Sequence, residues 1–391
     1  MNAITTIKEQ AQGIEIFDAL SQSENLDLHA VVRDFHDGVA ELRQLIETGA
    51  ILHCPTSQGK DSTIVSLMAI EAYRQAIAEG AIENTRPLIL STVDTGAEAL
   101  PMKMYVRYCF KRVKAYAIAC GIEGFRYDIV QPPINDQYFL KFTGSQKLVP
   151  NATRRGDCSI ILKVDPSERH VKKLMQEFSM ADQYTGAKVI TCVGSRVEES
   201  SRRSHNMTRQ GIASKGVDSV LSEIEESTLG GYPLYKYAPI RNWATDSVFD
   251  ALRLAGAKPL QKLANSKGIP SFLANHGLLL EIYGNGSSEV CAVSIGSNNS
   301  SGCNGRSRFG CVVCTMVASK DHSSSALAKL ERWRVLGAEN TLRVRDFLFR
   351  LSTQVEARAL HARAFDPTGF NRVALQPNTL RPRFVEKMVR F

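Results

Sequence analysis

Apolar side chains recur at helical spacing between residues 26 and 48. These positions are Leu28, Val31, Val32, Phe35, Val39, Leu42 and Leu45. Intervals of three and four residues place them on one face of a helix. Gly49 follows, and glycine is common just after a helix ends. The pattern predicts an N-terminal helix that leads into the first strand.

Beyond this helix, short apolar runs alternate with amphipathic segments. The runs predicted as strands are 51–57, 87–95, 125–133 and 188–195. Helices are predicted up to about residue 78 and over 104–121. Strands separated by helices predict an α/β fold, a doubly wound and mostly parallel sheet with helices on both faces. Ligands of such sheets bind beyond the carboxyl ends of the strands, where the strand order reverses.

Changes in composition divide the chain into four parts. They are a helical N-terminal segment (1–48), the α/β domain (49–255), a cysteine-rich region (256–323) and a basic C-terminal region (324–391). Residues 284–310 are rich in Gly, Ser and Asn, which predicts a long loop. Apolar spacing over 326–336 and 342–360 predicts helices, so the C-terminal region is expected to be helical.

The length and composition describe an ordinary globular chain. Its 391 residues, 43% hydrophobic and 23% charged, allow a substantial core and suggest two or three domains. Neither an apolar run of about 18 residues nor a signal-peptide pattern occurs, so we expect a cytoplasmic protein without a membrane partner. Structural disulfides are uncommon there, and the nine cysteines are expected to be packed residues, metal ligands or reactive thiols.

The formal net charge of +8 favours polyanionic partners. Basic residues are concentrated near the carboxyl end. Residues 361–391 contain only two acidic residues, Asp366 and Glu386, against the basic residues Arg363, Arg372, Arg381, Arg383, Lys387 and Arg390. Such a segment fits nucleic acid or a partner protein, and it equally fits a solvated surface that has no partner.

The segment SQGKDS, residues 57–62, joins the first strand to the next helix. Unpaired N–H groups and the helix dipole make such a turn an anion site. Gly59 permits close approach of a ligand, Lys60 adds positive charge, and Ser57 and Ser62 offer hydroxyls. A Walker A loop is excluded because Cys54 and Asp61 occupy positions that need Gly and Ser or Thr. The alternative is that Ser57 or Asp61 only caps the helix.

Two further polar segments should lie beside this turn. The residues Asp94 to Gly96 and Gly194 to Arg203 each follow a predicted strand. Because the carboxyl ends of parallel strands share one edge of a sheet, all three segments are expected to converge on one crevice.

The segment SQGKDS resembles the SGGKDS pyrophosphate loop of the ATP pyrophosphatase (PP-loop) superfamily, with Gln58 in place of the first glycine. Three later segments, TVDTGAE (92–98), GSRVEESSRR (194–203) and YAPIRNWATDSVFDAL (237–252), resemble motifs of its phosphoadenosine phosphosulfate reductase-like branch. The four motifs follow in order within residues 50–320, a far more specific signal than one motif alone.

The resemblance implies a role for each matching residue. The implied pyrophosphate-binding set is Ser57, Gln58, Gly59, Lys60, Asp61 and Ser62. Asp94 would lie near the nucleotide or Mg²⁺, and Gly194, Arg196 and Arg203 would face phosphate groups. Of these residues, Lys60, Asp61, Asp94 and Arg196 are implied to be catalytic.

Simpler structural roles stand beside these. Arg196 and Arg203 could pair with Glu198 and Glu199 on a solvated face. Asp94 could be a turn residue before Gly96. Trp243 and Val248, inside the last motif, are expected in the core.

The cysteines predict a metal site. Cys311 and Cys314 form a Cys-x-x-Cys pair, a spacing that lets two sulfurs reach one metal, and Cys303 precedes them closely. Three thiols are one short of a complete site; Cys291 and, for zinc, His322 are candidates for the fourth ligand. Thiolates suit both Zn²⁺ and a [4Fe-4S] cluster. Of the remaining cysteines, Cys109, Cys120 and Cys192 are expected to be packed, and Cys54, which precedes the loop, is expected to be a strand residue.

The segment FGCVVCTMVASKD (309–321) closely resembles a segment of the DndC-type DNA phosphorothioation proteins, to which the SspD proteins are related. The DndC-type proteins are iron-sulfur ATP pyrophosphatases. Cys158 stands where this branch often places an iron-sulfur cysteine. The resemblance therefore implies a [4Fe-4S] cluster on Cys158, Cys303, Cys311 and Cys314, with zinc as the alternative.

The implied function is that of an ATP pyrophosphatase and sulfurtransferase, which adenylates a DNA backbone phosphate for sulfur incorporation. The implied partners are DNA, a cysteine desulfurase as sulfur donor and other phosphorothioation-complex proteins. The alternatives are sulfonucleotide reduction, transfer RNA thiolation and a non-catalytic zinc module that binds nucleic acid. The reductase usually needs a cysteine near the carboxyl end, whereas none follows Cys314.

Overall fold

The computed structural model describes residues 28–151, 157–184, 186–199, 216–217, 228–229, 231–263, 268–284, 311–316, 321–365 and 373–390. Of the predicted site residues, Arg203, Cys291 and Cys303 lie outside the described residues. The structural statements below concern the described residues.

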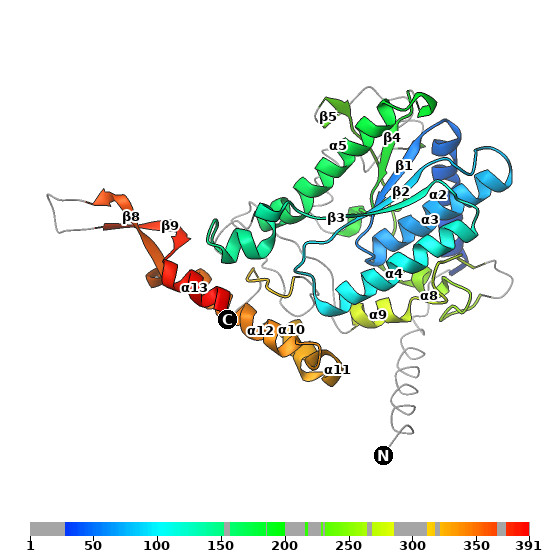
Figure 1. The fold of residues 1–391 in the computed structure, drawn as a ribbon. Coiled ribbons are helices and arrows are strands. Elements are labelled where there is room, and N and C mark those ends of the chain that lie inside the picture. The colour runs from blue at the N-terminus through cyan, green and yellow to red at the C-terminus, as the bar shows by residue number, and fades with distance from the viewer. Residues whose placement is uncertain are drawn as a thin grey trace, which may run out of the picture.

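A five-stranded parallel sheet forms the centre of the fold, in the order β3-β2-β1-β4-β7 (Figure 1). The strands are β1 (Ile51–Pro55), β2 (Leu88–Val93), β3 (Phe125–Val130), β4 (Val189–Cys192) and β7 (Tyr235–Tyr237). This arrangement confirms the predicted doubly wound α/β fold. The strand order reverses between β1 and β4, so the crevice expected for a ligand lies beyond the carboxyl ends of these two strands.

Helices cover both faces of the sheet. On one face pack α2 (Leu28–Glu47), α3 (Lys60–Ala78), α4 (Leu100–Ala119), α8 (Thr245–Leu254) and α9 (Gly277–Gly284). Their apolar side chains meet Leu52 and Leu90 in the larger core. The opposite face carries α5 (Asp165–Ser179), which packs on Ile51 and Ile89. Alternate residues of a strand point to opposite faces, which is why neighbours such as Ile51 and Leu52 enter different cores.

The smaller elements follow. Two short strands, β5 (Thr228–Leu229) and β6 (Tyr232–Pro233), pair antiparallel. The C-terminal region holds α10 (His322–Lys329), α11 (Glu331–Arg334), α12 (Ala338–Thr353) and α13 (Pro382–Arg390). Short 3-10 or π turns span Ile134–Asp136, Phe139–Thr143, Ile160–Val164, Asp182–Tyr184, Val197–Glu199 and Val355–Ala357. Within the described chain, no helix is both long and apolar enough to span a bilayer.

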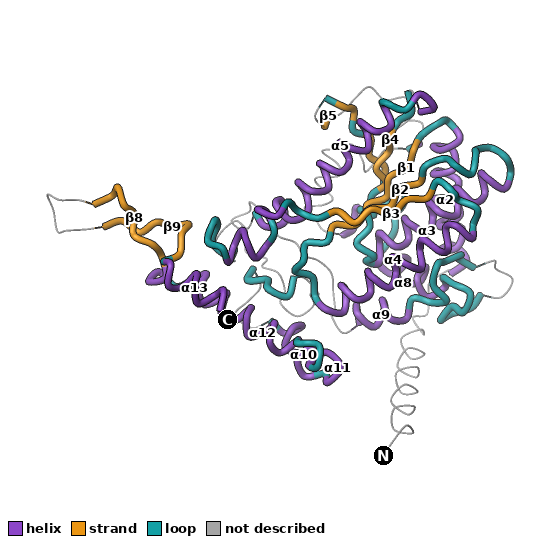
Figure 2. The backbone as a smooth tube through the Cα atoms, in the orientation of Figure 1, coloured by secondary structure: helices purple, strands orange, loops and turns teal. Residues whose placement is uncertain are grey.

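The C-terminal region is helical only in part, which corrects the expectation from sequence. Between α12 and α13 the chain forms an antiparallel pair, β8 (Arg358–Phe365) and β9 (Val373–Leu380), seen as a separate two-stranded arm in Figure 2. The predicted helix over 342–360 ends at Thr353. The sequence Asp-Pro-Thr-Gly at 366–369 is typical of a turn, and Pro377 disfavours a helix, so local signals for strands outweigh the apolar spacing here.

Candidate active site

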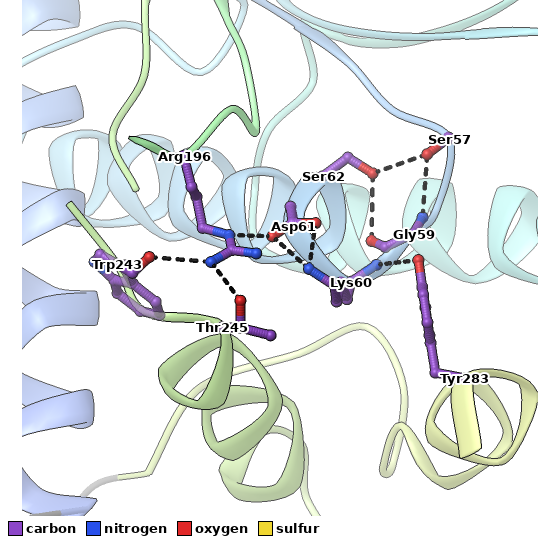
Figure 3. Close-up of polar contacts among 9 residues, drawn as sticks. All are labelled: Ser57, Gly59, Lys60, Asp61, Ser62, Arg196, Trp243, Thr245 and Tyr283. Carbon is purple, nitrogen blue, oxygen red and sulfur yellow. Dashed lines mark hydrogen bonds and ion pairs between the residues drawn. The ribbon is translucent and has the colours of Figure 1, made fainter. Parts of the chain in front are cut away.

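The turn between β1 and α3 places Lys60 at the first position of the helix. Figure 3 shows the serine hydroxyls of this turn gathered around Gly59. The Gly59 N–H donates to Ser57 Oγ at 3.4 Å, and Ser62 Oγ donates to the Gly59 carbonyl at 3.3 Å. The N-cap residue of α3 is Gly59, so neither Ser57 nor Asp61 occupies the cap position. A turn into the amino end of a helix is the kind of backbone that binds anions.

Gln58 adopts a left-handed backbone at the position where the resembled loop has glycine. Its φ is 55°, and its side chain is fully buried. The left-handed region costs a non-glycine residue roughly 1–2 kcal/mol. The Gln58 N–H donates to Thr56 Oγ1 at 3.1 Å, and its Nε2 donates to Tyr127 Oη of β3 at 2.9 Å. These two bonds hold the turn in the conformation that glycine would adopt freely.

Lys60, Asp61 and Arg196 form a buried charged network, the phosphate-site network (Figure 3). Lys60 Nζ lies 2.9 Å from Asp61 Oδ2, and Arg196 Nε lies 2.7 Å from Asp61 Oδ1. Arg196 is fully buried and Lys60 is 4% exposed. Two cations contact one carboxylate beside the amino end of α3. Positive side chains at this end of a helix add to the helix dipole and favour an anionic ligand.

Arg196 joins the two strands that flank the crevice. It follows β4, whereas Asp61 follows β1, and its Nη1 also donates to the Trp243 carbonyl at 3.1 Å and Thr245 Oγ1 at 3.0 Å. The alternative that Arg196 pairs with neighbouring glutamates on a solvated face is therefore wrong. Trp243 and Val248 are buried, as predicted.

Gly194 lies against the start of α3. A Cβ added there would sit 3.0 Å from both the Asp61 carbonyl carbon and the Ser62 backbone nitrogen. These are backbone atoms at the beginning of a helix, which cannot move aside cheaply. The predicted involvement of Gly194 thus has a steric basis, because only glycine allows β4 and α3 to approach this closely.

A Gly194→Ala variant is expected to raise the KM for ATP about tenfold, because overpacking of roughly 1–3 kcal/mol would displace the turn. Steady-state pyrophosphate release measures the KM. The matched control is Gly216→Ala, since a Cβ there would meet nothing within 4 Å. Equal KM values for both variants would contradict this role.

Asp94 ends β2 at the same edge of the sheet. Its N–H donates to the Val130 carbonyl at 2.8 Å, and its carboxylate accepts the Gly96 N–H at 2.9 Å. The turn role considered from sequence therefore exists in the structure. A half-buried carboxylate at this edge also offers the hard oxygen that Mg²⁺ prefers. Contacts among the described residues do not join Asp94 to the phosphate-site network.

Two aromatic residues that sequence reasoning missed stand beside Lys60. The Tyr283 hydroxyl, from α9, accepts the Lys60 N–H at 3.2 Å. The Phe249 ring, from α8, lies 5.7 Å from Lys60 Nζ and packs edge-on against Tyr283. Tyr283 thus contacts an amide of the kind that binds phosphate in such turns. Nothing in the apolar helix sequence GLLLEIYG marks this tyrosine in advance.

The Cys-x-x-Cys turn is fastened to the segment that follows β2. Cys311 forms an isolated antiparallel bridge with Glu98, and the Val312 N–H donates to the Ala97 carbonyl at 2.8 Å. The Cys314 N–H donates to the Cys311 carbonyl at 3.0 Å, which closes the turn. The cysteine region therefore lies next to the strand end that carries Asp94.

Three cysteines, called the cysteine cluster below, lie close enough to influence one another: Cys158, Cys311 and Cys314. Burial, followed by the charges of Cys311 and Cys314, raises the pKa of the Cys158 thiol to about 11. Burial and the same three thiols raise the pKa of Tyr138 well above its usual range. The structure thus brings the distant Cys158 to the Cys-x-x-Cys pair.

Thiolates are suitable metal ligands in their chemistry, and a metal cation would offset the repulsion among three of them. Within the described residues, however, no group of three or more His, Cys, Asp or Glu side chains is placed so that it could hold a metal ion, and this includes the three residues of the cysteine cluster. The other predicted ligand, Cys303, lies outside them. Cys54, Cys109 and Cys192 are buried and Cys120 is half-buried, as expected of packed cysteines.

A buried arginine, which the sequence pattern did not reveal, contacts the backbone of the cysteine cluster. Arg345 of α12 is fully buried, and its Nε donates to the Cys314 carbonyl at 3.0 Å. Leu348 of the same helix packs in the core that Cys158 and Cys311 contact. The C-terminal region therefore helps to hold the cysteine turn in place.

In metal-free protein, alkylation of Cys158 is expected to be slow at pH 8. The thiolate is the reactive form, and the raised pKa of Cys158 delays its appearance from about pH 9 to about pH 11. Mass spectrometry of iodoacetamide labelling against pH measures the curve. Replacing Cys311 and Cys314 by serine should shift it to lower pH. The curve of Cys120 should stay unchanged, because the pKa of Cys120 is shifted by burial and by the neighbours Tyr116, Arg74 and Glu71, and not by either replaced cysteine. An unmoved Cys158 curve would contradict the proximity of the three thiols.

Comparisons with known proteins add little to this description of the site. No family model matches the sequence, and no curated protein matches it. Among solved structures, a phosphate complex of phosphoadenylyl-sulfate (PAPS) reductase from Candida auris is similar over 58% of this chain and 86% of its own, with 18% identity and a TM-score of 0.29. We base no inference on a likeness of this size.

Proposed function

We propose that the chain is an ATP pyrophosphatase and sulfurtransferase that adenylates a DNA backbone phosphate for sulfur incorporation. The observation that carries the proposal is the phosphate-site network, which places Lys60 and Arg196 around Asp61 where the strand order reverses. The ordered resemblance of residues 50–320 to the phosphoadenosine phosphosulfate reductase-like branch and of 309–321 to the DndC-type proteins supplies the reaction class.

The chemistry consists of two displacements. A non-bridging oxygen of the DNA phosphate attacks the α-phosphorus of ATP, the bond to the β-phosphate oxygen breaks, and pyrophosphate leaves. Hydrosulfide, released from the persulfide of a cysteine desulfurase by a thiol reductant, then attacks the activated DNA phosphorus; the P–S bond forms, the bond from this phosphorus to the AMP oxygen breaks, and AMP leaves. The non-bridging oxygen of the DNA phosphate is a poor leaving group. The first step converts it into a good leaving group.

The residues of the turn act on the first displacement. Negative charge grows on the departing pyrophosphate, and Lys60 together with the N–H groups of 57–62 would stabilise it. Asp61 holds the Lys60 ammonium in place, and Arg196 holds Asp61. Asp94 would bind Mg²⁺, which supplies further neutralisation of phosphate charge when bound. Tyr283 would yield the Lys60 amide to a phosphate oxygen.

We assign Cys158, Cys303, Cys311 and Cys314 as ligands of a [4Fe-4S] cluster, with zinc as the alternative. The proximity of Cys158 to Cys311 and Cys314 supports the inclusion of Cys158 in this set. When bound, such a group would supply iron and sulfide next to the strand end that carries Asp94. Other phosphorothioation-complex proteins would act with this chain in the cytoplasm.

The test is pyrophosphate release from ATP by anaerobically purified protein, with and without duplex DNA. Iron, zinc and acid-labile sulfide are measured on the same sample. DNA-stimulated release together with iron and sulfide would support the proposal, and digestion of the DNA followed by mass spectrometry would detect phosphorothioate when the desulfurase is added. Zinc without ATP turnover would favour the nucleic-acid-binding module. Iron without ATP turnover would favour sulfonucleotide reduction.

A further inference from the structure

Helix α4 carries a strongly basic face. Its sequence, LPMKMYVRYCFKRVKAYAIA, contains no acidic residue. Its basic residues are Lys103, Arg107, Lys111, Arg112 and Lys114. The buried side of the helix consists of Pro101, Tyr105, Cys109, Val113 and Ala117. Four of these five cations, all except Arg112, therefore lie on the side that faces away from the core.

Four of the cations form one stripe, the α4 stripe, which consists of Lys103, Arg107, Lys111 and Lys114. At about 100° per residue, these positions fall within an arc of about 80°. Successive members at a spacing of four residues stand about 6 Å apart along the axis, and the stripe spans about 16 Å. A row of evenly spaced cations matches a polymer of evenly spaced anions better than it matches a single small ligand.

Acidic side chains of the described residues do not balance the α4 stripe. The ion pairs formed among the described residues include none of these four side chains. Like charges four residues apart destabilise a helix by roughly 0.2–0.5 kcal/mol for each pair. Arg107, Lys111 and Lys114 are exposed. The unfavourable repulsion would be relieved by an external polyanion.

Large side chains are exposed next to the stripe. Met104 is 49% exposed and Tyr108 is 46% exposed, and the Arg112 guanidinium lies 5.3 Å from the Tyr108 ring centroid. Methionine, tyrosine and arginine are enriched at binding interfaces relative to the rest of a protein surface. This composition distinguishes the face from a merely solvated one, which would carry mixed charges.

The helix begins at the edge of the sheet that carries the candidate active site. Residue 100 follows closely on Asp94, and α4 packs against both β3 and α9. Tyr105, on the buried side of α4, lies close to Tyr283, the tyrosine that contacts Lys60. The α4 stripe is on the opposite side of the helix, and its first member, Lys103, lies in the first turn after the strand edge that carries Asp94.

We infer that the α4 stripe binds the phosphate backbone of duplex DNA. This inference rests on the proposed function for the identity of the polyanion. The second basic helix, α13, is a weaker candidate because its cations already have partners in the chain. Arg390 pairs with Glu386 at 2.6 Å, and Lys387 Nζ lies 5.7 Å from the Phe347 ring centroid.

The test measures binding of a fluorescent 30-base-pair duplex by anisotropy over a series of salt concentrations. Each phosphate neutralised by a cation contributes about −0.9 to the slope of log K against log salt. A triple variant with Arg107, Lys111 and Lys114 each replaced by glutamine should lose about 2.7 of this slope and bind at least about tenfold more weakly at 0.1 M salt. Glutamine keeps the helix propensity of these positions, and circular dichroism checks the fold.

The matched control replaces Arg383, Lys387 and Arg390 with glutamine, which removes the same charge from α13. Loss of slope in the α4 variant alone supports the inference, and it does so even if the wild type releases no pyrophosphate. An unchanged slope in the α4 variant, or an equal loss in the α13 variant, overturns it even if DNA-stimulated pyrophosphate release is observed. A loss seen only with single-stranded RNA of equal length would also overturn the assignment to duplex DNA.

Discussion

Replacing Lys60 with alanine is expected to lower ATP-dependent pyrophosphate release by at least about 100-fold, the usual effect of losing one group that stabilises transition-state charge. Lys60 is only 4% exposed, so water screens its charge poorly. It also stands at the amino end of α3, where its charge adds to that of the helix dipole. The loss should fall mainly on kcat, because the charge on the leaving pyrophosphate grows during the reaction.

The control for this variant is Lys141→Ala. Lys141 also pairs with a carboxylate, Asp136 at 2.9 Å, but it lies outside the phosphate-site network. Pyrophosphate release by Lys141→Ala should stay within about twofold of the wild type, since isolated surface pairs contribute little. A Lys60→Ala protein that retains its unfolding temperature and most of its activity would rule out the assigned role of the turn.

Replacing Arg196 with methionine is expected to lower the free energy of unfolding by about 3–5 kcal/mol, the range measured when one partner of a buried ion pair is removed. The guanidinium is fully buried and binds Asp61 Oδ1, the Trp243 carbonyl and Thr245 Oγ1. Methionine of similar length leaves these acceptors without their donor. Pyrophosphate release should fall as well, because Asp61 would no longer hold Lys60 from a fixed position.

Urea unfolding of single and double variants separates these effects. The double variant Asp61→Asn with Arg196→Met should be less destabilised than the sum of the two single variants, because the asparagine removes the uncompensated charge. Arg241→Met serves as the control, since Arg241 is a partly buried arginine whose contact with Glu41 is longer, at 3.4 Å. Strict additivity in the cycle would show that Asp61 and Arg196 do not act together.

Local patterns predicted the framework well. Four of the five central strands and helices α2, α3 and α4 follow from apolar spacing, because this periodicity reports which face of an element meets the core. The strand β7 was not among the predicted strands, and its three residues are too few to show a period. The pair β8 and β9 was assigned to helix because its apolar spacing was weighed above its turn residues.

The sequence suggested candidate residues for the site but did not reveal the contacts between them. The turn at 57–62 has a local signature, whereas the pairing of Asp61 with Arg196 joins residues that are 135 positions apart. Local patterns carry no information about such pairings. Tyr283 and Arg345 were missed for the same reason, because each is an ordinary residue of its own helix and gains its role only from a distant partner.

The support that Arg345 gives to Cys314 also fixes an order of assembly during protein synthesis. Cys158 leaves the ribosome long before the two other thiols and before the helix that holds them, α12. Roughly 190 residues separate Cys158 from Arg345, which at 5–20 residues per second takes about 10–40 s. During that interval Cys158 is a solitary thiol without its neighbours. The three thiols are therefore brought together only after α12 has been synthesised.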